Sequence, residues 1–239
     1  MSELAGKRAL VTGASRGIGA AIALALAEHG ADVAITYERS AERAAEVVRA
    51  IESKGRRGVA IQADSADAAA VKRSVDAAAA ELGGLDILVN NAGIARGGPV
   101  AEITLADIDA LLAVNVRSVV LASQAAIPHL GEGGRIISIG SCLGERVPFP
   151  GVTVYSMTKS ALLSFTRGLA RELGPQGITV NLVQPGSTDT DMNPSDGAQS
   201  DLQRSMTALG HYGKSEDIAA AVAFLASPAA RQITGTTLT

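Results

Sequence analysis

Short apolar runs alternate with longer segments of helical composition along the whole chain. The runs hold few polar residues and no strict apolar–polar alternation, which is typical of strands buried on both faces. They lie at 8–12, 31–37, 58–64, 85–91, 134–141 and 177–186. The helical segments lie at 17–30, 40–55, 67–82, 104–130, 153–173 and 215–227. This alternation predicts an α/β fold in which helices cover both faces of a doubly wound, parallel sheet. Because no linker interrupts it, we expect a single domain over residues 1–239.

The composition narrows the class of partner and the compartment. Of the 239 residues, 47% are hydrophobic and 19% charged, and the formal net charge is −3. This balance argues against nucleic acid or an anionic membrane as a partner. No signal pattern opens the chain, and we expect no apolar run of membrane-spanning length. Cys142 is the one cysteine, which fits the cytoplasm. The three histidines have no ligand spacing, so we expect no metal site.

The stretch "TGASRGIG" at 12–19 follows the first predicted strand and opens the first predicted helix. Gly13, Gly17 and Gly19 permit a tight turn, close approach of the backbone to a ligand, and close packing of the helix on the sheet. The start of a helix also presents free N–H groups and a positive dipole end. The position of this turn therefore predicts a diphosphate-binding site.

Two further patterns suggest acid–base chemistry. Tyr155 and Lys159 are four residues apart on a predicted helix and share one face. A nearby ammonium is expected to lower the pKa of the phenol, which then gives its proton to a ketone oxygen. The alternative is an amphipathic tyrosine and a solvated lysine on a helix surface. Ser141 ends a strand, where ligands bind in such sheets; Ser138, three residues deeper, competes with it for the same role.

Four motifs, "TGASRGIG", "NNAG" (90–93), "YSMTK" (155–159) and "PG" (185–186), occur in one order and spacing. In this the chain resembles the short-chain dehydrogenase/reductase family, over nearly its whole length from Lys7 to about Thr236. The resemblance implies a Rossmann domain with a mostly parallel, seven-stranded sheet. It also implies a truncated last strand, because family members usually continue past "ITG..L" with an Asp-Gly-Gly segment and this sequence stops at Thr239.

The resemblance also implies site residues. The implied catalytic residues are Ser141, Tyr155, Lys159 and Asn115. The implied cofactor-binding residues are Gly13, Ser15, Arg16, Gly17, Ile18, Gly19, Tyr37, Arg39, Asp64, Ser65, Asn91, Ala92, Gly93, Tyr155, Lys159, Pro185, Gly186, Thr188 and Thr190. Two of these residues have an alternative interpretation. Asn115 could be a buried structural amide, and Asp64 could belong to the N-cap region of a helix.

The end of the second strand predicts which cofactor is used. A protein that binds NAD has Asp or Glu at this position, where the carboxylate accepts hydrogen bonds from the ribose hydroxyls. This chain has Tyr37 there. Arg16 lies in the glycine turn and Arg39 just after the strand, beside Glu38. Two guanidinium groups suit a 2′-phosphate, so we expect NADP(H).

Three functions compete for this sequence. The first is reduction of a fairly apolar, free ketone to an alcohol; the second is a 3-oxoacyl-[acyl-carrier-protein] reductase; the third is a protein that only binds a signalling nucleotide. An acyl carrier protein is acidic, so a reductase that acts on it is expected to have basic residues near the mouth of its pocket. At the two positions where the resemblance places them, this chain has Glu132 and Gln176. The expected pocket is lined by apolar or aromatic residues. They are Leu143, Val147, Phe149, Met192, Met206 and Tyr212. The resemblance further implies a homotetramer formed through 104–130 and 153–173.

Overall fold

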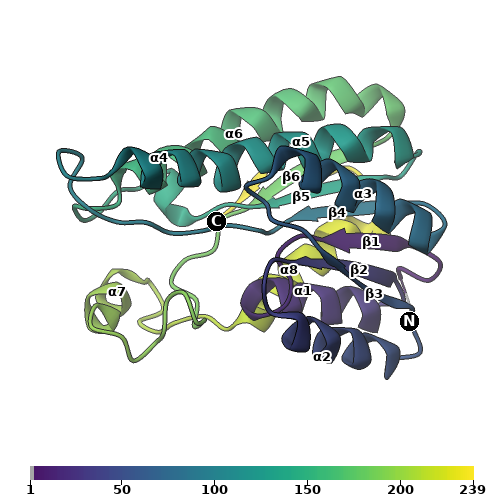
Figure 1. The fold of residues 1–239 in the computed structure, drawn as a ribbon, viewed down its shortest axis with the longest axis horizontal. Coiled ribbons are helices and arrows are strands. Elements are labelled where there is room, and N and C mark those ends of the chain that lie inside the picture. The colour runs from purple at the N-terminus through teal and green to yellow at the C-terminus, as the bar shows by residue number, and fades with distance from the viewer. Residues whose placement is uncertain (1–2) are drawn as a thin grey trace.

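The computed structural model describes residues 3–239 as one seven-stranded sheet with helices on both faces (Figure 1). The strands are β1 Arg8–Val11, β2 Asp32–Tyr37, β3 Gly58–Gln62, β4 Ile87–Asn90, β5 Arg135–Ile139, β6 Thr179–Val183 and β7 Thr237–Leu238. The helices are α1 Gly17–Glu28, α2 Ala41–Glu52, α3 Ala68–Leu82, α4 Leu105–Leu112, α5 Ser118–Ala126, α6 Thr153–Leu173, α7 Ser200–Met206 and α8 Ser215–Ala226.

Every strand pair is parallel, and the order β3-β2-β1-β4-β5-β6-β7 reverses direction between β1 and β4. This confirms the predicted doubly wound sheet, with a last strand of two residues. The predicted strands run one to three residues too long at their ends, because the flanking polar positions belong to turns. The short helix α7 was not predicted.

Alternate residues of the central strands enter two different cores. Ala9 and Val11 of β1 pack with α1, α2 and α8 on one face of the sheet. Leu10, between them, packs with α3, α5 and α6 on the other face. Figure 1 shows the two helical layers on opposite sides of the strands. Burial on both faces explains why the strands read as continuous apolar runs in the sequence.

The predicted helix at 104–130 is interrupted. Between α4 and α5 the segment Ala113–Arg117 is a π-helical turn, and Ile127–His129 forms a 3-10 turn at the end. The whole stretch Leu105–His129 is long and apolar enough to cross a membrane, with a mean hydropathy of 1.6 in its most apolar window, of which 44% is buried. Our expectation that no run reaches that length was wrong, yet Ala122, Ala125 and Ala126 pack into the core beside the sheet.

Candidate functional site

Polar and glycine residues meet where the central strands end at their carboxyl edge. The residues after β1, β4, β5 and β6 are the glycine turn, the NNAG turn, Ser141 and Pro185. Cys142, next to Ser141, donates its backbone N–H to the Pro185 carbonyl oxygen at 3.0 Å. The sheet topology thus brings together the four motifs that lie far apart in the sequence.

At two positions of the TGASRGIG stretch, neighbouring atoms leave no room for a side chain. Gly13 has φ +64°, and a Cβ there would lie 2.8 Å from the Ala92 Cα atom. A Cβ on Gly19 would lie 2.4 Å from Asn91 Nδ2 and 2.8 Å from the Gly13 carbonyl oxygen. Asn91 Nδ2 donates to the carbonyl oxygens of Thr12 and Gly13, at 2.9 and 3.0 Å. The glycine turn and the NNAG turn are therefore locked together.

Two threonines that we did not single out from the sequence support this junction. Thr12 Oγ1 accepts the backbone N–H groups of Asn91 and Ala92, both at 3.0 Å. Thr36 Oγ1, on β2, accepts the Gly13 N–H at 2.9 Å. A threonine at or near the end of a buried strand is the available sequence signal, because a hydroxyl there can satisfy a neighbouring turn.

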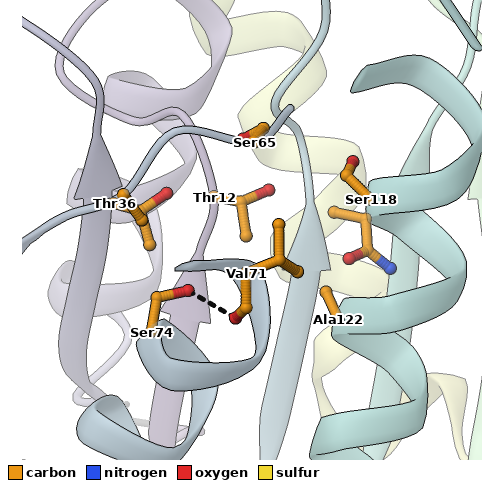
Figure 2. Close-up of a pocket in the computed structure, with 9 residues that line it drawn as sticks. Thr12, Thr36, Ser65, Val71, Ser74, Ser118 and Ala122 are labelled. Atoms are coloured by element: carbon orange, nitrogen blue, oxygen red, sulfur yellow. Dashed lines mark hydrogen bonds between the residues drawn. The ribbon is translucent and has the colours of Figure 1, made fainter. Parts of the chain in front are cut away.

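A small polar cavity lies next to these threonines (Figure 2). It holds about 10 Å³, roughly the room for one water molecule. Thr12, Thr36, Ser65 and Ser118 surround it, and Ser74 on its floor donates to the Val71 carbonyl oxygen at 2.8 Å. The cavity is too small for a nucleotide or a ketone, so it is not the binding site for either molecule.

Asn115 lies in the π-helical turn and is 1% exposed. Its Oδ1 accepts the Ile94 N–H and its Nδ2 donates to the Ile94 carbonyl oxygen, each at 2.9 Å. Nδ2 also donates to Thr158 Oγ1 at 3.1 Å. The amide thus satisfies the backbone just after NNAG and ties it to α6, so the reading as a buried structural amide holds. Thr158, inside "YSMTK", was missed.

Lys159 is buried, and its Nζ donates to the Ile139 carbonyl oxygen at 3.0 Å. A Cβ on Gly93 would lie 3.4 Å from Nζ and 3.5 Å from Asn115 Oδ1, so the NNAG turn and Asn115 both lie close to this ammonium. Burial lowers the pKa of Lys159 to about 8. The reading of Lys159 as a solvated surface residue is therefore wrong.

Tyr155 lies on the same face of α6, with its ring centroid 5.9 Å from Lys159 Nζ. Burial raises the pKa of its phenol, and the neighbouring Ser141 hydroxyl offsets part of that rise. We expected Lys159 to lower this pKa. That expectation was wrong for the cofactor-free protein, because the ammonium is directed to the Ile139 carbonyl instead.

Ser141, not Ser138, faces this region. Ser141 follows β5 and its Oγ accepts the Leu143 N–H at 3.2 Å. Ser138 lies within β5, is 1% exposed, and accepts from Asn90 Nδ2 at 3.4 Å. The residues after Ser141 also touch α6, since a Cβ on Gly144 would lie 3.1 Å from the Lys159 carbonyl carbon.

The remaining predicted cofactor residues surround the glycine turn. Ser15 is half-buried, and Ile18 packs against the core beneath α1. Asp64 is exposed and accepts the Ala66 N–H at 2.8 Å, and the half-buried Ser65 follows it. The N-cap residue of α3 is Asp67, and Asp64 lies three residues before it, in the turn that leads into the helix.

The PG segment after β6 runs past the glycine turn. The buried Thr188 donates to the Gly186 carbonyl oxygen at 3.1 Å. Thr190 Cγ2 would lie 3.6 Å from a Cβ on Gly17, whose φ is +55°. Thr190 therefore lies next to Gly17, at the start of α1.

The structure separates the two arginines that we grouped from the sequence. Arg39, just after Tyr37 and Glu38, is 88% exposed and its Nε lies 2.8 Å from Glu38 Oε1. Arg16 Nη1 instead lies 3.0 Å from Asp191 Oδ2, and Arg43 Nη1 contacts the same oxygen at 2.8 Å. Neither Arg43 nor Asp191 stood out in the sequence, because each belongs to an ordinary polar stretch.

The expected pocket residues come from two segments. Leu143, Val147 and Phe149 follow Ser141, whereas Met192, Met206 and Tyr212 lie on the segment that carries α7. Val147 and Met192 are each 56% exposed and Met206 is 42% exposed. The Arg204 guanidinium stacks 5.5 Å from the Tyr212 ring centroid. Exposed apolar side chains therefore lie on both segments that follow the carboxyl edge.

Glu132 and Gln176 lie elsewhere. They precede β5 and β6, and their two turns meet, since Gly133 N–H donates to the Gly177 carbonyl oxygen at 3.0 Å. That is the amino edge of the sheet, five strand residues, or about 16 Å, from Ser141. Within one protomer our placement of these positions near the pocket mouth was wrong.

Comparison with known proteins identifies the family. A family model described as "Enoyl-(Acyl carrier protein) reductase" matches residues 13–239. A short chain dehydrogenase from Burkholderia cenocepacia, solved in complex with NADP, is 65% identical, with a TM-score of 0.98 over 99% of this chain and 96% of that chain. The chain belongs to the short-chain dehydrogenase/reductase family of oxidoreductases.

Two relatives of known name differ in what they do. A 3-oxoacyl-[acyl-carrier-protein] reductase of Staphylococcus aureus is 43% identical over 97% of this chain and 95% of its own length. A cyclic-di-GMP-binding biofilm dispersal mediator protein of Escherichia coli is also 43% identical, over 98% and 95%. Overall identity therefore does not distinguish a carrier-protein reductase from a nucleotide-binding relative.

Proposed function

We propose that this protein is a cytoplasmic, NADPH-dependent reductase that converts a fairly apolar ketone to an alcohol. The observation that carries the proposal is the grouping of Tyr155, Ser141 and the buried Lys159 at the carboxyl edge, beside a glycine turn in front of α1. A protein that only binds a nucleotide has no need for a half-buried phenol beside a serine hydroxyl.

The residues around the glycine turn fit NADP(H). The first turn of α1 offers N–H groups to a diphosphate, and no carboxylate ends β2, where Tyr37 stands. The pairing of the Asp191 carboxylate with the Arg16 and Arg43 guanidinium groups supports anion binding at this surface. The cofactor, when bound, supplies a hydride to the carbonyl carbon.

The chain's own residues supply the proton. Tyr155 would give its proton to the carbonyl oxygen of the ketone as negative charge develops on that oxygen. Because burial raises the pKa of Tyr155, the phenol is protonated at neutral pH and ready to donate. We assign Ser141 to hold the carbonyl oxygen by a hydrogen bond. We assign Lys159 and Asn115 to hold the cofactor ribose side of the site and the NNAG turn.

The choice of a free ketone rests on the exposed apolar side chains of the two segments at the carboxyl edge. Val147, Met192 and Met206 offer an apolar, adaptable surface. The named relatives favour two alternatives, a 3-oxoacyl carrier-protein substrate or a cyclic dinucleotide.

Two measurements, NADPH oxidation and cyclic-di-GMP binding, separate the three functions. NADPH oxidation is measured with an aryl ketone and with a 3-oxoacyl carrier protein, using one enzyme sample. We expect the higher kcat/KM with the aryl ketone. A higher value for the carrier-bound chain that falls steeply with salt supports the first alternative instead. No turnover of any ketone, together with tight cyclic-di-GMP binding, supports the second.

A further inference from the structure

A carboxylate occupies the position where two arginines converge. Asp191 Oδ2 lies 3.0 Å from Arg16 Nη1 and 2.8 Å from Arg43 Nη1. The three residues come from the glycine turn, the first turn of α2, and the segment after β6, up to 175 positions apart. Hydrogen bonds from Arg43 and Arg16 hold the pKa of Asp191 below its usual range, so it is a carboxylate at neutral pH.

Arg39 does not take part in this cluster. Its side chain is 88% exposed and is paired with the adjacent Glu38. Among residues 3–239, no hydrogen bond or ion pair joins Arg39 to Arg16, Arg43 or Asp191. Arg43 therefore replaces Arg39 as the second basic group next to the glycine turn.

We propose that Arg16 and Arg43 form the 2′-phosphate site of NADP(H), and that Asp191 occupies this site in the cofactor-free protein and is displaced by the phosphate. The proposal rests on the cofactor of the proposed function. Guanidinium groups bind carboxylates and phosphates with the same geometry. A phosphate dianion and the Asp191 carboxylate repel each other, so both cannot hold the two arginines. Asp191 is thus an internal competitor that lowers affinity for the phosphorylated cofactor alone.

Displacement of Asp191 should also affect the segment from 187 to α7, which carries expected substrate-pocket residues. Asn193 and Gln203 exchange two side-chain hydrogen bonds, at 2.9 and 3.0 Å, and Ser187 Oγ donates to Gln203 at 2.9 Å. The segment from 187 to α7 is therefore held together as one unit, which carries Met192. Its ion pair with Arg16 and Arg43 links it to the cofactor side. NADP(H) breaks this link, whereas NAD(H), which has no 2′-phosphate, leaves it intact.

Nucleotide binding tests the proposal without relying on turnover. Dissociation constants for NADP⁺ and NAD⁺ are measured for the unmodified protein and for Arg43→Met, Arg39→Met and Asp191→Asn. We expect Arg43→Met to weaken NADP⁺ about tenfold or more and to leave NAD⁺ within about twofold. The matched control Arg39→Met should change NADP⁺ less than about threefold. Asp191→Asn should tighten NADP⁺ several-fold and leave NAD⁺ unchanged.

Loss of NADP⁺ affinity in Arg39→Met but not in Arg43→Met would overturn the inference and leave the proposed function standing. Weaker NADP⁺ binding by Asp191→Asn would also overturn it. Absence of binding by both nucleotides would overturn the inference and the proposed function together. NAD⁺ binding reports folding in each variant, since every substituted side chain is at least half exposed.

Hydrogen exchange gives a second readout. We expect faster amide exchange over 187–206 in cofactor-free Asp191→Asn than in the unmodified protein. NADP⁺, but not NAD⁺, should change exchange there in the unmodified protein. Identical exchange with the two nucleotides would contradict displacement of Asp191.

Discussion

At the residue scale, Lys159 is a buried cation whose position destabilises the fold. It is buried, it has no carboxylate within 4 Å among residues 3–239, and burial lowers its pKa to about 8 from 10.5. Between these two pH values the unfolded chain holds more protons than the folded protein. Stability therefore rises with pH over this window, and below pH 8 the full cost of burying the charge remains.

This gives a prediction for Lys159→Met in the cofactor-free protein. At pH 7 the variant should be more stable than the unmodified protein, by up to about 3 kcal/mol, because it buries no charge. The difference should shrink as pH rises from 8 to 10. Urea unfolding of both proteins at pH 7 and pH 9.5 measures it. A difference that stays constant with pH would show that Lys159 does not titrate in this window.

The order of the motifs in the sequence identified the candidate residues, but it could not predict which atoms these residues contact. The spacing of Tyr155 and Lys159 predicted a shared helix face, which the structure has. It could not predict that the ammonium bonds the Ile139 carbonyl, because that contact depends on where β5 ends relative to α6. Arg43 and Asp191 were missed for the same reason: they meet only through folding.

At the element scale, the turn between β1 and α1 depends on the absence of side chains. Gly19→Ala places a Cβ against Asn91 Nδ2 and the Gly13 carbonyl, so we expect a loss of about 1–3 kcal/mol in stability and weaker cofactor binding. Thermal unfolding and NADP⁺ titration measure both effects. The matched control is Gly168→Ala, inside α6, where an added Cβ meets no atom within 4 Å, so the substitution should be neutral or slightly stabilising. Equal effects of the two substitutions would argue against the steric account.

Elements with a clear apolar period were predicted correctly in type, and most ends were off by one to three residues. The π-helical turn at Ala113–Arg117 could not be predicted, since its sequence is as apolar and helical as its flanks. Within this turn the Asn115 side-chain amide satisfies both backbone groups of Ile94. Helix α7 was missed because its short stretch Ser200–Met206 has little apolar period.

At the scale of the whole molecule, the helices on one face leave apolar side chains in solvent. Leu105, Leu112 and Val120 on α4 and α5 are 71%, 38% and 40% exposed. We expect this face and α6 to form a subunit contact in a homotetramer. Light scattering at micromolar concentration should give four times the mass of one chain, and Val120→Glu should give a smaller species. A monomer mass for the unmodified protein would contradict the prediction.

The most direct test of the account compares Tyr155→Phe with the unmodified protein. The substitution keeps the ring and removes the acid. NADPH binding should stay within about threefold, while kcat for ketone reduction should fall by about a hundredfold or more. A kcat near that of the unmodified protein, at equal NADPH affinity, would contradict the assignment of Tyr155 as the proton donor.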